Sequence, residues 1–325
     1  MGTVLVTGGA GFLGSYVVAE LLEAGERVVV YDASTATNVL DQVVAPDARL
    51  GLTLVQGEID DVWSLFRLCE QESVDRVVHL AAPLTDWVQQ NPLAGLRAMC
   101  GGTAALLEVA RALSIERVVW TSSISVYGRS YDIRAGSSSA RAPESLYGSF
   151  KVLCEDLAIA YRAGHGVDSV GLRLPVLYGP WRARGLKASF GQDGDPLRAA
   201  ALGLPVVIRH PRRTLNWLYV ADAAAVLVLA LRSSASLDPI FDVSGEVASM
   251  RDFAGLMRAI APLAEITVEE TLDAELEPTQ DVLMSALDDS ALRAQLDWER
   301  RYSLREGIAA TLAIYTRDAE RADVP

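Results

Sequence analysis

The feature that most constrains the fold of this chain is a glycine pattern directly after a short apolar run. Residues 4–7 (Val-Leu-Val-Thr) have the length and composition of a buried strand, and glycines follow with the spacing G-x-x-G-x-x-G. A stretch of helical character begins at Phe12. Such glycines permit a tight turn and a close backbone approach to a pyrophosphate, which the helix N-terminus attracts. An ordinary tight turn would show the same glycines. The flanking strand and helix favour a dinucleotide site, made by Gly8, Gly11, Phe12, Leu13 and Gly14.

The first half of the chain repeats this alternation of strand-length apolar runs and amphipathic stretches. Strands are predicted at Thr3–Thr7, Arg27–Tyr31, Leu52–Gln56, Arg76–Leu80, Arg117–Ser122 and Asp168–Leu174. Helices are predicted between them at Phe12–Glu23, Val62–Glu72, Pro92–Ala112 and Leu146–Tyr161. This order is typical of an α/β protein with a doubly wound parallel sheet, the Rossmann arrangement.

The second half predicts a smaller mixed α/β substrate lobe on the C-terminal side. Trp181–Pro196 is rich in Gly, Arg and polar residues and indicates a loop, whereas Asp222–Leu231 predicts a helix. Ile240–Val243 predicts a strand that returns to the sheet, and the remainder from Met250 is mostly helical. We therefore assign residues 1–176, with 222–245, to the NAD-binding domain, and 177–221 and 246–325 to the lobe.

An acidic residue at the end of the second strand indicates which dinucleotide binds. Asp32 follows Gly14 by 18 residues, and the next arginine is Arg49. A carboxylate there can accept both ribose hydroxyls and repels a 2′-phosphate, so we expect NAD, although a solvated strand-end carboxylate would look the same. Ligands of such sheets bind at the carboxyl ends of the strands. Further cofactor contacts are therefore expected from Asp60, Asp61, Leu80, Ala81 and Ala82, with His79 as a packed or hydrogen-bonded strand residue.

A tyrosine and a lysine four residues apart carry the predicted chemistry. Tyr147 and Lys151 share one face of a predicted helix. The ammonium favours the phenolate, which suits general acid–base catalysis, and it can also hold the nicotinamide ribose. Lys151 is one of only two lysines among 29 basic residues, which makes a chance pairing less frequent. Ser123, at the end of the fifth strand, could hydrogen-bond the reacting oxygen, or could simply cap a turn.

Several of these segments together resemble one enzyme family. They are Thr7–Gly14, Asp32, His79–Ala82, Ser123 with Val126-Tyr127-Gly128, Tyr147–Lys151, and Arg173 with Tyr178-Gly179-Pro180. They are similar to the extended short-chain dehydrogenases/reductases, in the NAD-dependent epimerase/dehydratase branch, up to about residue 245. The resemblance implies a Ser123/Tyr147/Lys151 triad, bound NAD, and a homodimer formed by the helices at Pro92–Ala112 and Leu146–Tyr161.

Departures from the family pattern bear on the substrate. Ile124 and Ser125 replace the Asp-Glu pair of sugar 4,6-dehydratases, which removes the proton donor for water elimination and also disfavours nucleotide-sugar decarboxylation. Val176 and Met99 stand where the family often has asparagine, and Leu215-Asn216-Trp217 lacks its arginine, so a nucleotide on the substrate is in doubt. Substrate contacts are expected from Ser123, Pro83, Val176, Trp181, Arg182 and Trp217. An anionic group could also meet arginines that would otherwise be solvated: Arg182, Arg184, Arg209, Arg212 and Arg213.

Composition narrows the possible partners. The net charge of −13 and pI near 4.8 disfavour nucleic acid and anionic membranes. Three cysteines, Cys69, Cys100 and Cys154, suggest neither a disulfide framework nor a metal site and fit a reducing cytoplasm. We expect no leader, no membrane span and a carbohydrate-like small-molecule substrate.

Three functions remain open at this stage. The first is an NAD-dependent sugar or nucleotide-sugar epimerase that transfers hydride with the triad. The second is a dehydrogenase or reductase of a sugar-like or other small alcohol or carbonyl compound. The third is a non-catalytic NAD-binding sensor, against which the intact triad argues.

Overall fold

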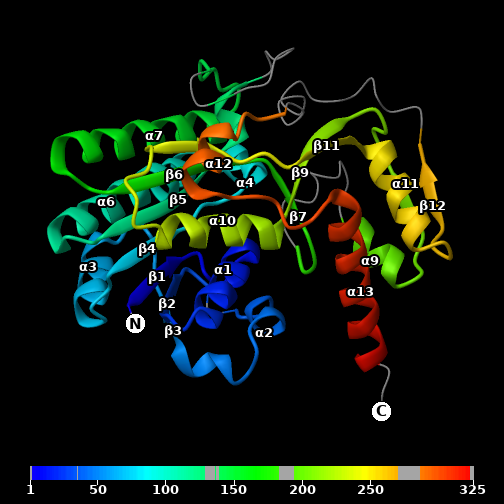
Figure 1. Ribbon diagram of the computed structural model, residues 1–325, viewed down its shortest axis with the longest axis horizontal. Coiled ribbons are helices and arrows are strands. Elements are labelled where there is room, and N and C mark those ends of the chain that lie inside the picture. The colour runs from blue at the N-terminus through cyan, green and yellow to red at the C-terminus, as the bar shows by residue number, and fades with distance from the viewer. Residues whose placement is uncertain are drawn as a thin grey trace.

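A parallel seven-stranded sheet forms the centre of the molecule (Figure 1). The computed structural model describes residues 2–34, 36–128, 136, 139–182, 194–269 and 286–322. The strand order is β10-β6-β5-β4-β1-β2-β3, and it reverses between β1 and β4. The strands are β1 (Thr3–Thr7), β2 (Arg27–Asp32), β3 (Leu52–Gln56), β4 (Arg76–His79), β5 (Arg117–Ser123), β6 (Ser169–Leu174) and β10 (Ile240–Asp242). The predicted Rossmann arrangement is confirmed.

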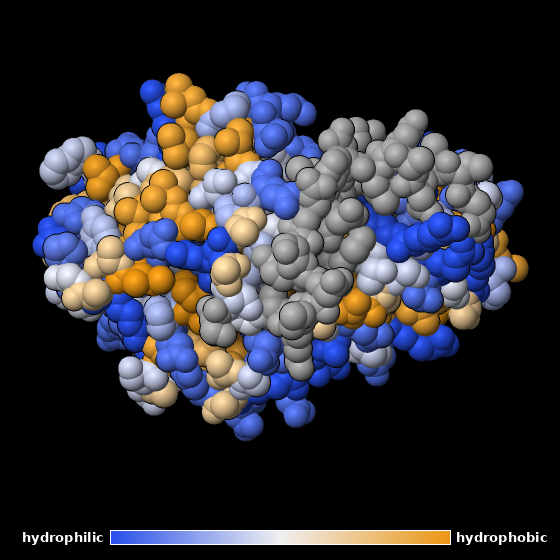
Figure 2. Space-filling view, turned by 90° about the horizontal axis from the view of Figure 1, so that it is seen from above, coloured by the Kyte–Doolittle hydropathy of each residue, from blue (hydrophilic) through white to orange (hydrophobic). Residues whose placement is uncertain are grey.

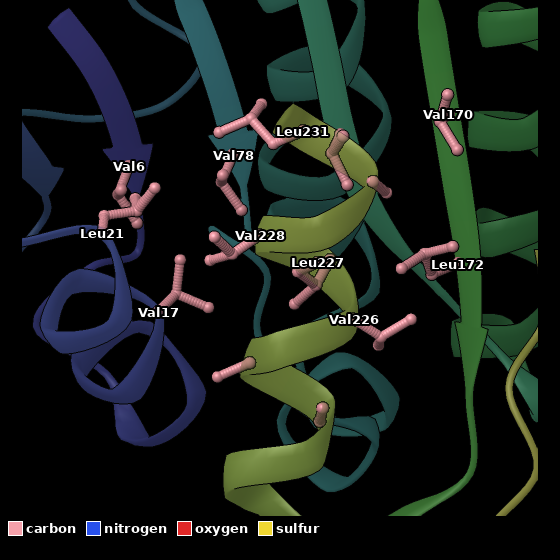
Figure 3. Close-up of a cluster of buried hydrophobic side chains, with 14 of the residues drawn as sticks. Val6, Val17, Leu21, Val78, Val170, Leu172, Val226, Leu227, Val228 and Leu231 are labelled. Carbon is pink, nitrogen blue, oxygen red and sulfur yellow. The ribbon is translucent and has the colours of Figure 1, made fainter. Parts of the chain in front are cut away.

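Helices cover both faces of this sheet. One face carries α1 (Phe12–Glu23), α2 (Leu40–Val43) and α10 (Val220–Arg232); Figure 3 shows α10 lying beside α1 and over β4 to β6, with Leu227 and Val228 in the core. The other face carries α3 (Val62–Gln71), α6 (Gly102–Leu113) and α7 (Leu146–His165). Valines at neighbouring strand positions point to opposite faces of the sheet. Val29 lies in the hydrophobic core on one face and Val30 in the core on the other.

In the described residues, the smaller lobe has two short sheets and three helices. It is drawn to the right in Figure 1. One sheet joins β11 (Glu246–Ser249), β9 (Thr214–Tyr219) and β7 (Val176–Tyr178), and the other joins β12 (Ile266–Val268) and β8 (Val206–Ile208). The helices are α9 (Pro196–Ala201), α11 (Met250–Ile260) and α13 (Leu304–Ala322). An aromatic cluster of Tyr178, Trp217 and Phe253 fills its core. Most of the loop expected at Trp181–Pro196 lies outside the described residues.

One segment differs from the predicted division of the chain. We expected all of 246–325 in the lobe, but α12 (Ser290–Leu296) packs against the large sheet. Leu292, Leu296 and Trp298 belong to the core that also holds Phe241 of β10. Burial of this apolar face brings the chain back to the large sheet a second time.

The predicted helix at Pro92–Ala112 is present but is not regular. It consists of α5 (Pro92–Leu96), a π-helical turn η2 (Arg97–Gly101) and α6, and a short helix α4 (Thr85–Gln90) precedes it. By length and composition, the 22 residues from Pro92 to Leu113 could span a membrane. Half of the most apolar window of 18 residues is buried inside the protein.

Candidate functional site

The glycine turn between β1 and α1 has the geometry of a phosphate-binding loop. Gly8 has a positive φ of 72°, and a Cβ there would lie 2.7 Å from the backbone nitrogen of Ala81. Gly11 is the N-cap residue of α1, with no side chain that caps the helix. Its surroundings are open, because a Cβ on Gly11 would meet only the Gly8 carbonyl oxygen. The first-turn N–H groups of a twelve-residue helix therefore face an open cradle that fits a pyrophosphate.

Asp32 lies beside this turn. Its carboxylate accepts hydrogen bonds from the backbone N–H groups of Ala10 (3.1 Å) and Ser34 (3.0 Å). These bonds fix a negative charge at the end of β2, next to the cradle. Asp60 and Asp61 follow β3, and the Asp61 side chain caps α3. It accepts from the Ser64 N–H and hydroxyl, which lower the pKa of its carboxyl.

The end of β4 lines a narrow hollow at the point where the strand order reverses. Small residues Ala81 and Ala82 form one wall, and Pro83 follows them, partly exposed. We call this feature the switch-point hollow; it is lined by His79, Leu80, Ala81, Ala82, Met99, Thr103, Trp120, Thr121, Lys151 and Cys154. In doubly wound sheets, ligands bind at this crevice.

His79 is a buried, hydrogen-bonded strand residue, as predicted. Its Nδ1 lies 2.7 Å from the Thr7 hydroxyl and its Nε2 lies 3.3 Å from the Thr103 hydroxyl. Burial, with the nearby charge of Lys151, lowers the pKa of His79 from 6.5 to about 3. The ring is therefore neutral in the folded protein near neutral pH.

The His79 environment predicts acid sensitivity. Below about pH 6.5 the His79 imidazole binds a proton in the unfolded chain but stays neutral in the folded protein. The free energy of unfolding therefore falls as the pH drops. We expect this residue alone to remove about 2 kcal/mol of unfolding free energy between pH 7 and pH 5. Urea titrations at both pH values should show a smaller loss for His79→Gln than for the wild type. His165→Gln, at the exposed end of α7, serves as the control, and an equal loss in all three proteins would contradict the assignment.

Of the predicted catalytic residues, Lys151 lines the switch-point hollow, and Tyr147 lies next to it on α7. Ser145 caps α7, and Tyr147 and Lys151 lie one turn apart on it. The Lys151 ammonium donates to the Thr121 carbonyl oxygen at 2.6 Å and stands 5.7 Å from the Tyr147 ring centroid. It is only 5% exposed. Buried charge held in this way is fixed in position rather than free to rotate.

Ser123 ends β5 beside the first turn of α7. Its hydroxyl oxygen accepts from the Ser125 N–H and donates to the Ser125 hydroxyl, both at 3.1 Å. A Cβ on Gly148 would come within 2.4 Å of the Ser125 carbonyl oxygen, so the serine turn and the start of α7 are in contact. Ser123 thus caps a turn and also places a hydroxyl close to the tyrosine helix.

The sequence analysis did not predict a buried network of charged side chains that joins β5, β6 and β10 to α7. Glu155 is fully buried and accepts from the Ser122 hydroxyl (2.6 Å) and from two nitrogens of Arg173 (2.8 and 2.7 Å). Arg173 also donates to the Tyr127 hydroxyl, which donates to Asp242 (2.7 Å). Burial raises the pKa of Asp242 to about 6. One feature of the sequence could have indicated this network. Glu155 follows Lys151 by four residues and therefore lies on the same face of the helix.

The predicted substrate residues are not all brought together. Trp217 is 1% exposed, and its indole donates to the Ala248 carbonyl within the lobe core, where Val176 is also buried. Trp181 instead lines a separate cavity of about 340 Å³ between α1, α2 and α13. The Arg182 guanidinium stands 5.8 Å from the Phe12 ring, next to the phosphate cradle, and burial lowers its pKa to about 10. The described residues therefore bring only Arg182 of these four near the cofactor loop.

The other arginines are placed differently from one another. Arg213 is buried and Arg212 is exposed, whereas Arg209 pairs with Glu269 at 3.5 Å. Arg184 lies outside the described residues. Nothing in the described part of the chain gathers these arginines into one anion site.

Comparison with known proteins gives a consistent picture. The model of the NAD dependent epimerase/dehydratase family matches residues 4–243. UDP-glucuronate 4-epimerase 4 of Arabidopsis thaliana is 31% identical over 241 residues, which are 70% of this chain and 54% of that protein. UDP-glucose 4-epimerase of Lacticaseibacillus casei is 32% identical over 247 residues, 71% of this chain and 72% of the other. This chain spans about half the length of the plant relatives.

A solved structure supports the same grouping. The UDP-glucose 4-epimerase of Thermus thermophilus, determined in complex with NAD, superposes with a TM-score of 0.80 at 26% identity. The match covers 96% of this chain and 98% of the other. The similarity therefore includes the lobe as well as the nucleotide-binding sheet.

Proposed function

This chain belongs to the NAD dependent epimerase/dehydratase family, in the extended short-chain dehydrogenase/reductase group, and we propose that it is an epimerase of a sugar or nucleotide sugar. The observation that carries the proposal is the Lys151 ammonium, fixed on the Thr121 carbonyl and next to the Tyr147 ring at the switch-point hollow. A phenol and a fixed cation at the ligand crevice of a doubly wound sheet suit proton transfer coupled to hydride transfer.

The cradle and its neighbours fit NAD. Gly11, Phe12 and Leu13 would hold the pyrophosphate at the open N-terminus of α1, and the carboxylate of Asp32 would accept the adenosine ribose hydroxyls. That fixed negative charge opposes a 2′-phosphate and favours NAD over NADP. Bound there, NAD supplies the site that accepts the substrate hydride and returns it.

The side chains then divide the remaining work. Tyr147 removes the proton from a substrate hydroxyl and returns it when the carbonyl is reduced from its other face. Ser123 donates a hydrogen bond to the reacting oxygen and orients it. Lys151 stabilises the phenolate by its charge and holds the nicotinamide ribose. Ile124 and Ser125 offer no carboxyl acid beside this oxygen, so we do not propose water elimination.

The substrate class rests on the relatives. Both named relatives act, by their names, on UDP-linked sugars, which supports a carbohydrate-like substrate here. The family asparagine positions are Val176 and Met99, both buried and apolar. We therefore propose a carbohydrate whose nucleotide, if it has one, is held by other contacts.

The second candidate is a dehydrogenase or reductase that uses the same residues once and exchanges its cofactor. The identity of any nucleotide released on denaturation of the purified protein separates the two. We expect mass spectrometry to find stoichiometric NAD, followed by isomerisation of a free or nucleotide-linked sugar without net change in NADH absorbance. An empty site that turns over added NAD would support the dehydrogenase. Binding of NAD without any hydride transfer would indicate a sensor.

A dimer is the proposed assembly, formed by the outer faces of α5, α6 and α7. Leucine side chains are exposed there, including Leu93 (65%) and Leu153 (42%), with Ile159 on the same helix as Leu153. Figure 2 looks down on the side where α7 lies in Figure 1 and shows apolar areas on that half of the molecule. Apolar surface of this kind marks interaction sites.

Leu153→Arg should therefore weaken the dimer. Each of two copies would lose the burial of the 42% of Leu153 that is exposed in the monomer. That burial is about 0.6 kcal/mol or more per copy, so the dissociation constant should rise at least about tenfold. Sedimentation equilibrium would measure it. Leu263→Arg is the control, because Leu263 is 98% exposed in the lobe. A wild-type monomer at micromolar concentration would refute the assembly.

A further inference from the structure

We propose that Cys100 and Cys154 form a peroxide-reactive dithiol, a modification site at the edge of the switch-point hollow. A hydroperoxide would join the two residues in a disulfide that links η2 to α7. The oxidation is argued from the positions and the surroundings of the two thiols. Its effect on turnover rests on the proposed function.

The two cysteines face each other across the contact between η2 and α7. The Cys100 thiol donates to the Phe150 carbonyl and the Cys154 thiol donates to the Met99 carbonyl, each at 3.6 Å. Each thiol thus reaches the backbone next to, or one turn before, the other cysteine, which places the two side chains side by side. They are 6% and 2% exposed, respectively, and both are free thiols.

Their surroundings make the two sulfurs unequal. Cys154 lines the switch-point hollow with Lys151, and its sulfur accepts from the Thr103 hydroxyl at 3.4 Å. The neighbouring Cys100 thiol, the Lys151 charge and this hydroxyl lower the pKa of Cys154 to about 7, although burial and Glu155 oppose them. The pKa of Cys100 is raised by the neighbouring Cys154 thiol and by burial. Cys154 is therefore the nucleophile and Cys100 the resolving thiol.

The chemistry balances with a hydroperoxide as the oxidant. The Cys154 thiolate attacks one peroxide oxygen, the O–O bond breaks, and the products are a sulfenic acid and, after proton uptake, water or an alcohol. The Cys100 sulfur then attacks the sulfenic sulfur, the S–OH bond breaks, and water leaves with the Cys100 proton. Two thiols are oxidised and one peroxide is reduced.

The disulfide would distort the candidate active site. A sulfur–sulfur bond of about 2.05 Å is much shorter than the contact between two non-bonded sulfurs, so the two side chains and the segments η2 and α7 that carry them must move toward each other. Cys154 lies three residues after Lys151 on α7, and Cys100 lies in a π-helical turn, a type of turn that is frequent at functional sites. A displacement of about 1 Å in such a site can cost about a hundredfold in rate.

Peptide mapping tests the site without reference to turnover. Reduced protein is treated with hydrogen peroxide, denatured, alkylated and digested. We expect one cross-linked peptide pair containing Cys100 and Cys154, restored to free thiols by dithiothreitol, while Cys69 remains alkylated. Cys69 is the internal control, because it is also buried and burial raises its pKa to about 12.

Variants separate the steps. Cys100→Ser should halt at the Cys154 sulfenic acid, which dimedone would trap, and Cys154→Ser should give no oxidised product at Cys100. Cys69→Ser should still form the cross-link. Free thiols at both cysteines after peroxide, oxidation of Cys69 instead, or a cross-link between two protein copies would each overturn the proposal. If the cross-link forms but the reduced protein shows no NAD-dependent turnover, the proposed modification site is supported and the proposed function is refuted.

Discussion

Replacing Tyr147 by phenylalanine should lower turnover by about two to four orders of magnitude, the usual contribution of a positioned general acid–base. The phenol is the proton acceptor and donor in the proposed reaction, and no second ionisable group is proposed to take over its role. The ring itself packs in the core below α7, so its shape should be retained. NAD binding should therefore be unchanged. Steady-state kinetics on the identified substrate and calorimetric titration with NAD would measure both quantities.

The matched control is another tyrosine on the same helix. Tyr161 lies toward the other end of α7, where its hydroxyl donates to Glu108 at 3.3 Å, away from the switch-point hollow. Tyr161→Phe should keep wild-type turnover. Full activity in Tyr147→Phe would remove the phenol from the mechanism, and loss of NAD binding would show that the change damaged the cofactor site instead.

The large sheet could be predicted because its signals are local. Each strand is a short apolar run next to a turn or helix, and β1, β3 and α1 begin and end where the sequence analysis placed them. Parallel strands buried on both faces need continuous apolar runs, which are easy to recognise. The returning strand β10 has only three residues, and its pairing with β6 is shown only by the structure.

The lobe could not be predicted in the same detail. Its strands β7, β8 and β12 have three residues each, which is too short for a two-residue alternation to stand out. Their partners are distant in sequence: β8 pairs with β12, and β7 pairs with β9. The position of α12 on the large sheet also depends on which core accepts its apolar face, which periodicity does not specify.

The site shows the same division between local and long-range signals. The spacing of Tyr147 and Lys151 is a local signal and predicted a shared helical face. The acceptor for Lys151, the Thr121 carbonyl, is backbone from another element and leaves no mark in the residue types. Trp217 illustrates the opposite case, because a large aromatic side chain can line a pocket or fill a core, and only the structure shows that it is buried.

Breaking the buried pair of Arg173 and Glu155 should have the largest effect on stability. Arg173→Ala would remove two hydrogen bonds from the fully buried Glu155, which would keep its 3.2 Å ion pair with Arg141. It would also remove the cation that faces the buried Asp242 at 3.6 Å. Removing one partner of such a pair costs about 3–5 kcal/mol. Denaturant titration should show this loss in the free energy of unfolding. The exposed pair of Arg111 and Glu108 is the control, because Arg111→Ala there should change stability little.

A double change distinguishes the cost of an orphaned charge from the value of the pair itself. Arg173→Met with Glu155→Leu removes both members of the pair, so the part of the stability loss that comes from Glu155 should return, whereas the part that comes from Asp242, which faces Arg173 at 3.6 Å, should remain. The Ser122 hydroxyl, however, would lose its acceptor on α7. The hydrogen bond from the end of β5 to Glu155 on α7 would then be lost, while the bond from Lys151 to the Thr121 carbonyl would remain. We therefore expect partly recovered stability with reduced turnover, whereas full turnover would mean that the network serves folding alone.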